Sequence, residues 1–418
     1  MNTLGRYAQP SAGSLTQVRL RKAALVFVMA LLGLSYMFNA IDRQSFPALL
    51  GGIRGTYGLT LAQAGFVSTV FTINIAAFGA LSGWFLARFT RKSVLVGGLL
   101  SYSLFTMLTP LAQGFVTLTI YRALTGVGEA LQIAAIYSCL GSYFGKHRGA
   151  AMGVMLAFFG VGAFSGPIIG TQLNELVGSW RFPLYLFGIL GVVIAFASAF
   201  LLPSSFTESS ERVLGGEGAT LAQTPSSASR LLNRNVCLSA LSFSLVSLSL
   251  FSYFALYPTY LKEHLGYSAV AAGTALGMYG VGGMGAIVGG WAGDLLGRKG
   301  MFACLMIVAV VGFCLFNGVE HPFMQGALSV MFGLMNSGYF YARFMSVIQR
   351  SAPPEKIGYA VAIAMGSSYL SGPFAGMLFG KLAGLWGWST AANLLVVAPP
   401  CVALVLMSFI DFRKVREA

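Results

Sequence analysis

The sequence predicts an all-α membrane protein with twelve transmembrane helices in two six-helix bundles, and three observations support this fold class. Of 418 residues, 56% are hydrophobic and only 9% are charged, whereas a soluble domain carries about 25% charged residues. The apolar segments are long enough for helices, since strands of a membrane barrel need only about 10 residues. Short motifs in the first half of the chain recur in the second.

Charged residues, glycine and proline divide the chain into twelve apolar spans. We place the spans at residues 23–45, 61–83, 93–111, 116–140, 149–173, 182–203, 236–261, 269–292, 300–319, 323–347, 357–380 and 391–410. The first span is too long for the apolar part of a signal peptide, so we expect it to be a retained helix.

The longest polar stretch, residues 204–235, lies between the sixth and seventh spans. It is rich in Ser, Thr, Glu and Arg, a composition typical of a flexible linker. We therefore expect an N-terminal six-helix bundle over residues 1–203, a cytoplasmic linker over 204–235 and a C-terminal six-helix bundle over 236–418.

The distribution of Lys and Arg predicts the orientation in the membrane. Most of these residues lie on the same side as the N-terminus, and the opposite loops hold only Arg54, Arg181, Lys262 and Lys381. The positive-inside rule then places both termini and the linker in the cytoplasm, and we expect a multi-pass protein of the plasma membrane, that is, a bacterial inner membrane. The same scatter of basic residues over inner loops explains the net charge of +14 without a nucleic-acid partner.

Enzymatic and cofactor chemistry is not indicated. The five cysteines lie in apolar stretches without metal-ligand spacing, and the three histidines are far apart in sequence. Gly376–Leu382 and Gly141–His147 lack the spacing of a phosphate-binding loop. We expect no metal, no cofactor and no catalytic residues, and a monomer that works in the lipid bilayer.

The two halves repeat each other at an offset of 206 to 208 residues, which is how many secondary transporters are built. The paired motifs are Gly83–Lys92 with Gly290–Lys299, Ser165–Gly170 with Ser371–Gly376, and Gly58–Gly65 with Gly266–Gly273.

The segment Gly290–Lys299 reads G-x-x-x-D-x-x-G-R-K and resembles the signature loop of the major facilitator superfamily. The resemblance covers all twelve spans and implies the major facilitator fold, with an inner gate at these loops. Ala87 and Thr90 depart from the motif in the first copy, so we expect a weaker latch in the N-terminal half. The gating residues implied are Arg88, Arg91, Lys92, Asp294, Arg298 and Lys299.

Few ionisable side chains fall within the apolar spans. They are Asp42, Arg43, Arg122, Glu129 and Arg343. Each costs about 2.5–3.5 kcal/mol at mid-bilayer on insertion scales, so these residues are the strongest functional candidates.

Helical spacing groups these charges. Arg122 and Glu129 are seven residues apart and project from one face, and Arg43 shares a face with Tyr36 and Asn39. A carboxylate beside an arginine suits a proton site, because ligand binding to the arginine changes the carboxylate's proton affinity.

Asp42 is rotated by about 100° from Arg43. A purely structural alternative remains, in which two buried ion pairs only hold helices together. In that alternative Asp42 would pair with an arginine, and Glu129 with Arg122.

A finer resemblance rests on Asn39–Arg43, Arg122–Glu129 and Tyr257-Pro258, which look like the anion:cation symporters, a family that includes sugar-acid/proton symporters and sialin. The resemblance implies that Arg43 and Arg122 bind an anionic substrate and that Asp42 and Glu129 carry protons. Leu131–Ile133 departs from that family's proline-containing run. Spinster-like lipid transporters share the Asp42-Arg43 and Gly128-Glu129 pairs of residues, so these pairs alone do not indicate which substrate is transported.

The second half offers an uncharged counterpart to this site. Asn336 occupies the repeat position of Glu129 and is spaced by three and four residues from Tyr339 and Arg343, although Arg343 could instead reach the inner surface. Further candidate cavity residues, each of which could equally be a packing residue, are Gln132, Tyr253, Tyr257, Ser367, Ser368 and Tyr369.

The sequence therefore predicts a proton-coupled secondary transporter that moves a small organic anion, a carboxylate, by alternating access. The alternative is a proton-coupled exporter of a lipid or amphipathic drug. Gly162–Gly170 resembles the fifth-span motif of drug/proton antiporters, but its copy in the second half favours a packing role shared by both halves.

Overall fold

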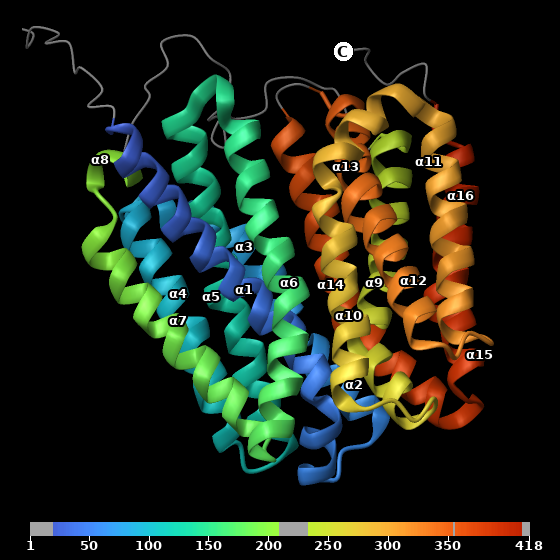
Figure 1. Cartoon of the computed structure of the whole chain (residues 1–418). Helices are drawn as coiled ribbons and strands as arrows, with labels where there is room; N and C mark the ends of the chain where they lie inside the picture. The colour runs from blue at the N-terminus through green and yellow to red at the C-terminus, as the bar shows by residue number, and fades with distance from the viewer. Residues whose placement is uncertain (1–19, 209–232, 354–355, 412–418) are drawn as a thin grey trace, which may run out of the picture.

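The computed structural model describes residues 20–208, 233–353 and 356–411, except for the side chains of residues 146, 286–297, 342, 357 and 358 (Figure 1). Within those ranges the regular elements are all helices. The fold is therefore all-α, as the composition and hydropathy predict.

The first half of the chain forms a set of long helices joined by short turns. Its elements are α1 (Lys22–Tyr57), α2 (Leu61–Thr69), α3 (Phe71–Arg88), α4 (Arg91–Leu108), η1 (Thr109–Leu111), α5 (Phe115–Phe144), η2 (Gly145–His147), α6 (Arg148–Val177), α7 (Arg181–Leu201) and α8 (Ser204–Thr207).

The second half is interrupted more often, and η3 and η5 are π-helices. Its elements are α9 (Arg234–Glu263), α10 (Ala269–Met284), α11 (Ala286–Phe316), α12 (Pro322–Gly333), η3 (Leu334–Phe340), α13 (Tyr341–Ser351), α14 (Ile357–Trp386), α15 (Trp388–Ala392), η5 (Asn393–Val397) and α16 (Ala398–Ser408).

Ten helical segments of the described residues are long and apolar enough to cross a membrane. They coincide with ten of the twelve predicted spans. The other two spans are divided: the span at 269–292 falls on α10 and the start of α11, and the span at 323–347 falls on α12, η3 and α13. The structure therefore agrees with a multi-pass membrane protein. The spans at 61–83 and 391–410 are also interrupted, at Val70 and by η5.

The internal repeat appears as the same turn in both halves. Gly58 and Gly266 have φ of 61° and 71°, a conformation that glycine adopts without steric cost. Two residues later, Thr60 and Ser268 cap the following helices by accepting hydrogen bonds from backbone N–H groups. The motif repeat at residues 58–65 and 266–273 therefore encodes a helix start.

One expectation about a connecting segment was wrong. We expected a short loop at 290–299, but the backbone is helical throughout α11; no proline interrupts this segment, so a helix can form despite its glycines. The linker expected over residues 204–235 begins with the short helix α8, in which Phe206 is fully buried against Tyr143, with ring centroids 4.6 Å apart. Most of the predicted linker, residues 209–232, lies outside the described residues.

The two halves of the chain lie beside each other in Figure 1, with α1–α8 in blue and green and α9–α16 in yellow to red. We call the end where α1 begins and α16 ends the terminal end, and the opposite end, where α1 and α9 finish, the far end. α7 also finishes, and α9 begins, at the terminal end (Figure 1). The helices of each half therefore run back and forth between these two ends.

Glycines allow the halves to touch closely toward the far end. A Cβ atom added to Gly376 of α14 would lie 2.0 Å from the carbonyl oxygen of Gly65 in α2, and one added to Gly277 of α10 would lie 2.5 Å from the carbonyl oxygen of Phe164 in α6. Real Cβ atoms do not approach so closely, so glycine is required at both contacts. Arg54 and Glu263 add an ion pair between the ends of α1 and α9, so the two halves are in contact at the far end.

Candidate functional site

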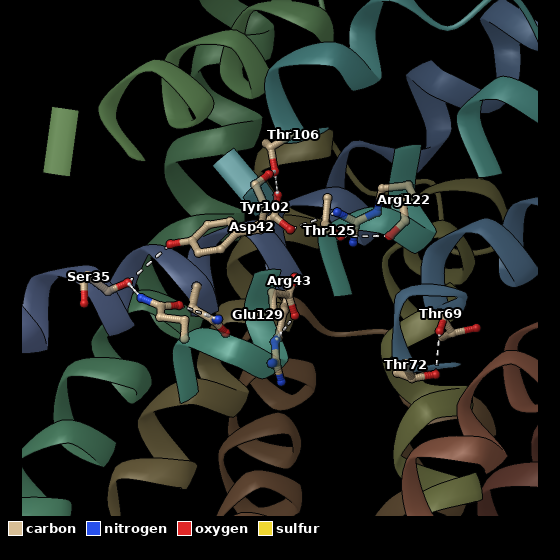
Figure 2. A network of polar contacts seen from close by, with 12 residues as sticks. Ser35, Asp42, Arg43, Thr69, Thr72, Tyr102, Thr106, Arg122, Thr125 and Glu129 are labelled. Carbon is tan, nitrogen blue, oxygen red and sulfur yellow. Dashed lines mark hydrogen bonds and ion pairs between the residues drawn. The ribbon is translucent and has the colours of Figure 1, made fainter. Parts of the chain in front are cut away.

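The first ion pair of the site joins α1 to α5. Asp42 accepts a hydrogen bond of 2.9 Å from Nη1 of Arg122 through Oδ2 and one of 2.5 Å from the Thr106 hydroxyl through Oδ1. Both side chains are sealed from solvent, with exposed fractions of 3% and 1%. Figure 2 shows Asp42 between Thr106 and Arg122, which come from α4 and α5. Opposite charges that stay paired can be buried in this way.

The second ion pair involves the neighbouring residue of α1. Nε of Arg43 donates to Oε2 of Glu129 over 2.6 Å, and the two side chains point toward each other in Figure 2. Because residues 42 and 43 are rotated by about 100° on the helix, Asp42 and Arg43 reach different partners on α5. The structure therefore corrects one expectation: Glu129 pairs with Arg43, and Arg122 pairs with Asp42.

Aromatic rings surround both guanidinium groups. The centre of the Arg122 guanidinium lies 4.3 Å from the centroid of Phe46 and 5.3 Å from that of Phe71. The Arg43 guanidinium lies 5.7 Å from Phe71 and 5.9 Å from Phe159. Cations over aromatic faces are stabilised where water is excluded, so these rings help to hold two arginines within an apolar bundle.

The two pairs differ in access and in unmet hydrogen-bonding capacity. The Arg43 side chain keeps 10% of its surface exposed, whereas Glu129 keeps 0% and Arg122 keeps 1%. Nη2 of Arg43 and Oε1 of Glu129 have no hydrogen-bond partner among the described residues, and neither do Nε and Nη2 of Arg122. Among these charges, Arg43 is the one that a ligand can reach directly.

An amide network lies one helical turn away. Nδ2 of Asn39 donates to Oε1 of Gln132 over 2.8 Å, and Nε2 of Gln132 donates to the Ser35 carbonyl over 3.0 Å. Tyr36 lies on the same helix, and its hydroxyl is 3.4 Å from that of Tyr137. The residues that the sequence predicted on α1 and α5 thus lie close together. The side-chain amides of Asn39 and Gln132 form hydrogen bonds that join these two helices.

The second half holds an uncharged network instead. The Tyr253 hydroxyl donates to Ser329 over 3.1 Å, Ser329 donates to the Tyr257 hydroxyl over 3.1 Å, and that hydroxyl donates to Oε1 of Gln325 over 2.8 Å. All four residues are buried. Their groups satisfy one another, so the structure places Tyr253 and Tyr257 in a packed core between α9 and α12.

A π-helix separates the other candidates of the second half. Asn336 and Tyr339 lie within η3, and Arg343 lies in α13. Nδ2 of Asn336 donates to the carbonyl of Phe332, four residues earlier in α12, over 3.0 Å, and Tyr339 is buried. The wider π turn changes the α-helical register, so a spacing of three and four residues does not place these residues on one face as it would in an α-helix.

The serines of α14 have different surroundings. The Ser367 hydroxyl donates to the Ala364 carbonyl one turn earlier over 3.0 Å. The Ser368 hydroxyl lies 2.5 Å from that of Ser247 in α9. Ser368 therefore joins two helices of the second half, as a packing residue would.

The gating residues implied by the signature motif lie at the terminal end. Nζ of Lys92 donates to the Leu202 carbonyl over 2.8 Å, and Nη1 of Arg91 donates to the Thr207 carbonyl over 3.3 Å. Glu208 accepts hydrogen bonds from the first backbone N–H groups of α4. In the first copy, which lacks the motif's acid, a carboxylate from the end of α8 therefore supports the start of α4.

The other gating residues are placed as follows. Arg88 stacks over Trp84 at 5.0 Å, and Arg298 stacks over Phe302 at 5.3 Å. Lys299 is exposed. The side chain of Asp294 lies outside the described residues.

Sequence reasoning missed several partners in the site. Thr106, Tyr137, Phe46 and Phe71 are ordinary helix residues by type, and no spacing rule relates them to a charge on another helix. Among the described residues, no group of three or more His, Cys, Asp or Glu side chains could hold a metal ion. The chemistry available here is proton exchange at a carboxylate and anion binding at a guanidinium.

The fold and the site define a multi-pass transporter built from a repeated helical unit. The Major Facilitator Superfamily matches residues 32–376 and 239–417, and the chain belongs to this family. Its members in the comparisons below are transporters, not enzymes.

Relatives include organic-acid and lipid transporters. A hexuronate transporter of Bacillus subtilis is 26% identical over 349 residues, covering 78% of this chain and 81% of the relative. A cis,cis-muconate transport protein of Acinetobacter baylyi is 24% identical over 371 residues, covering 86% and 87%. The sphingosine-1-phosphate transporter SPNS2 of Mus musculus is 25% identical over 221 residues, covering 52% and 40%.

A solved structure has the same fold. It is a bacterial homolog to the human lysosomal transporter Spinster in an inward-facing and occupied conformation, with a TM-score of 0.77, 15% identity, and coverage of 95% of this chain and 100% of that one. This likeness supports the fold alone.

Proposed function

We propose that the protein is a proton-coupled transporter of a small organic anion, in which Glu129 exchanges the proton and Arg43 binds the substrate carboxylate. The observation that carries this proposal is the Arg43–Glu129 pair, in which the arginine is partly accessible and both groups keep an unused hydrogen-bonding atom. An anion and the Glu129 carboxylate would compete for one guanidinium. Protonation of Glu129 frees Arg43 for the substrate.

The net charge of the two ion pairs limits the number of carboxylates that the substrate can carry. Arg122 is sealed and neutralised by Asp42, so protonation of Glu129 leaves a single uncompensated cation at Arg43. A buried charge needs a partner, and one cation matches one carboxylate. The site would therefore favour monocarboxylates, and a second carboxylate on the substrate would lack a partner there. In this scheme Asp42 and Arg122 hold α1 and α5 in position, so Asp42 would be the weaker candidate for the transported proton.

The proposed cycle uses the two halves as moving bodies. With the far end closed by glycine contacts and by Arg54 and Glu263, the site would open toward the terminal end, which the positive-inside rule places in the cytoplasm. A cysteine at Gln113, which is exposed at the far end, should react with an impermeant thiol reagent on intact cells, and one at Ser204 should not. The reverse pattern would overturn this orientation.

The function is tested by transport in proteoliposomes. We expect an inward proton gradient to drive uptake of at least one monocarboxylate among glucuronate, gluconate and benzoate, with muconate taken up less well. Arg43→Lys should remove binding, because a point charge cannot grip a carboxylate at two atoms. Retained binding in Arg43→Lys would reject the proposed role of Arg43.

A second candidate function, export of a lipid or amphipathic drug, has one specific observation in its favour. An apolar pocket of about 570 Å³ lies between α1 and α6 near the terminal end, lined by residues such as Met29, Val154 and Phe158. A hydrocarbon chain would gain free energy by entering it. Lysolipid binding that is lost in Val154→Trp but unchanged in Arg43→Lys, without pH-driven carboxylate uptake, would replace the first proposal by this one.

A further inference from the structure

The site at Arg43 is incomplete when only the first half is considered. Glu129 occupies Nε, Nη2 has no hydrogen-bond partner among the described residues, and the side chain keeps 10% of its surface exposed. A carboxylate bound there would still have oxygen lone pairs to satisfy in a largely apolar bundle. Further donors must face Arg43 from elsewhere, because an unsatisfied polar group is costly in such surroundings.

Tyr369 of α14 is the first such donor. Its hydroxyl lies within electrostatic range of the Arg43 guanidinium, across the boundary between the halves. Its ring is held by Phe251 of α9, with centroids 6.1 Å apart. A residue of the second half is thus directed at the cation of the first, and aromatic packing on its own half keeps it in place.

Tyr341 is the second donor. It is the first residue after the π-helix η3, a type of segment that is frequent at functional sites, and it lies within electrostatic range of Arg43, Tyr36 and Tyr369. Its side chain keeps 43% of its surface exposed, so it lines open space rather than packed protein. Its hydroxyl contacts the Met365 sulfur at 3.7 Å, and a thioether is a weak acceptor, so the hydroxyl remains available to a ligand.

We propose that Tyr341 and Tyr369 form the second wall of the anion site at Arg43, so that a bound carboxylate joins the guanidinium of one half to two phenol hydroxyls of the other. This proposal rests on the proposed function and adds the residues through which the second half takes part. Each hydroxyl would donate a charge-assisted hydrogen bond to the anion. Binding would then draw α13 and α14 toward α1.

The first test needs no knowledge of the substrate. In a variant whose five cysteines are replaced, single cysteines at Tyr341 and Tyr369 are treated with an anionic sulfonatoethyl or a cationic trimethylammonioethyl methanethiosulfonate reagent. When each rate is divided by the same reagent's rate with a free thiol, attraction to a guanidinium in a low-dielectric site should favour the anionic reagent about tenfold, and Arg43→Gln should remove that preference. A cysteine at Tyr359, which is exposed on the same helix as Tyr369, should show no change with Arg43→Gln.

The second test measures binding. For a monocarboxylate that the wild-type protein binds, Tyr341→Phe and Tyr369→Phe should each weaken affinity about fivefold, the typical loss for one hydrogen bond, while Tyr359→Phe leaves it unchanged. Equal rates of the two reagents after this division, or unchanged affinity in both Phe variants, would overturn the role of the tyrosines. If the wild-type protein binds no carboxylate but the preference for the anionic reagent persists, the proposed function is wrong. The placement of Tyr341 and Tyr369 opposite Arg43 is then still supported.

Discussion

The two halves of this protein share a backbone repeat but handle buried polarity in different ways. The first half holds four ionisable side chains, Asp42, Arg43, Arg122 and Glu129, in two ion pairs, and all of them except Arg43 are fully buried. The second half, in its described part, buries hydroxyl and amide groups that bond to one another, as between Tyr257 and Gln325. At one repeat position the first half has Glu129 and the second has Asn336.

The charged network of the first half and the uncharged network of the second differ in the number of protonation and pairing states that each can adopt. Uncharged groups that satisfy one another have a single favourable arrangement, and they stabilise the packing of α9 against α12. A carboxylate paired with an arginine has two states, ionised and protonated, and the arginine can exchange its partner for a ligand. The repeated sequence motifs thus account for the helical backbone that both halves share. The charged residues of the first half account for the groups that can change protonation state and binding partner.

The largest effect should come from removing the titratable group itself. Glu129→Gln is neutral at every pH, so we expect complete loss of pH-driven accumulation while exchange of substrate for substrate continues. Asn336→Ala, at the repeat position, should keep the proton dependence. Uptake in proteoliposomes with and without a pH gradient measures both, and a full proton-driven signal in Glu129→Gln would break the proposed contrast between the halves.

Asp42→Asn should mainly affect stability. It leaves the sealed Arg122 without a countercharge, and breaking a buried ion pair costs about 3–5 kcal/mol. We expect a large decrease in the melting temperature of the purified protein, and partial recovery in the double variant Asp42→Asn, Arg122→Met, which removes both charges. If the double variant is no more stable than the single one, the pair is not the source of the loss.

A smaller effect is expected in the second half. Tyr257→Phe removes one hydroxyl from the buried network, which should reduce the free energy of unfolding by about 1–3 kcal/mol, since Gln325 loses its donor. The pH dependence of transport should not change. A shifted pH profile in this variant would mean that the uncharged network takes part in coupling.

The smallest effect concerns the ion pair at the far end. Arg54 and Glu263 are about one-third exposed, and such pairs contribute about 0.2–1 kcal/mol. Arg54→Gln should therefore favour opening of the far end only slightly. We expect a small increase in thiol labelling at a nearby cysteine, and this difference should disappear at high salt because exposed charges are screened. A salt-independent increase would point to packing instead.

Sequence reasoning predicted the helices, the repeat and the charged residues of the site, because hydropathy and rare intramembrane charges are local signals. It did not predict which arginine pairs with which carboxylate, since that depends on how α1 is rotated against α5. It also missed Tyr341, because the preceding π-helix changes the register that an ideal α-helix would give. Thr106 and the rings around Arg122 became visible only through packing between helices.

At the contact between Gly65 and Gly376, one added methyl group would force the two helices apart. Because a Cβ at either position would overlap the opposing backbone, alanine there is incompatible with the closed far end yet leaves each helix intact. This arrangement of the two halves therefore depends on the absence of a side chain at both positions. The same site offers a simple handle for trapping the opposite conformation, for example to raise antibodies that recognise it.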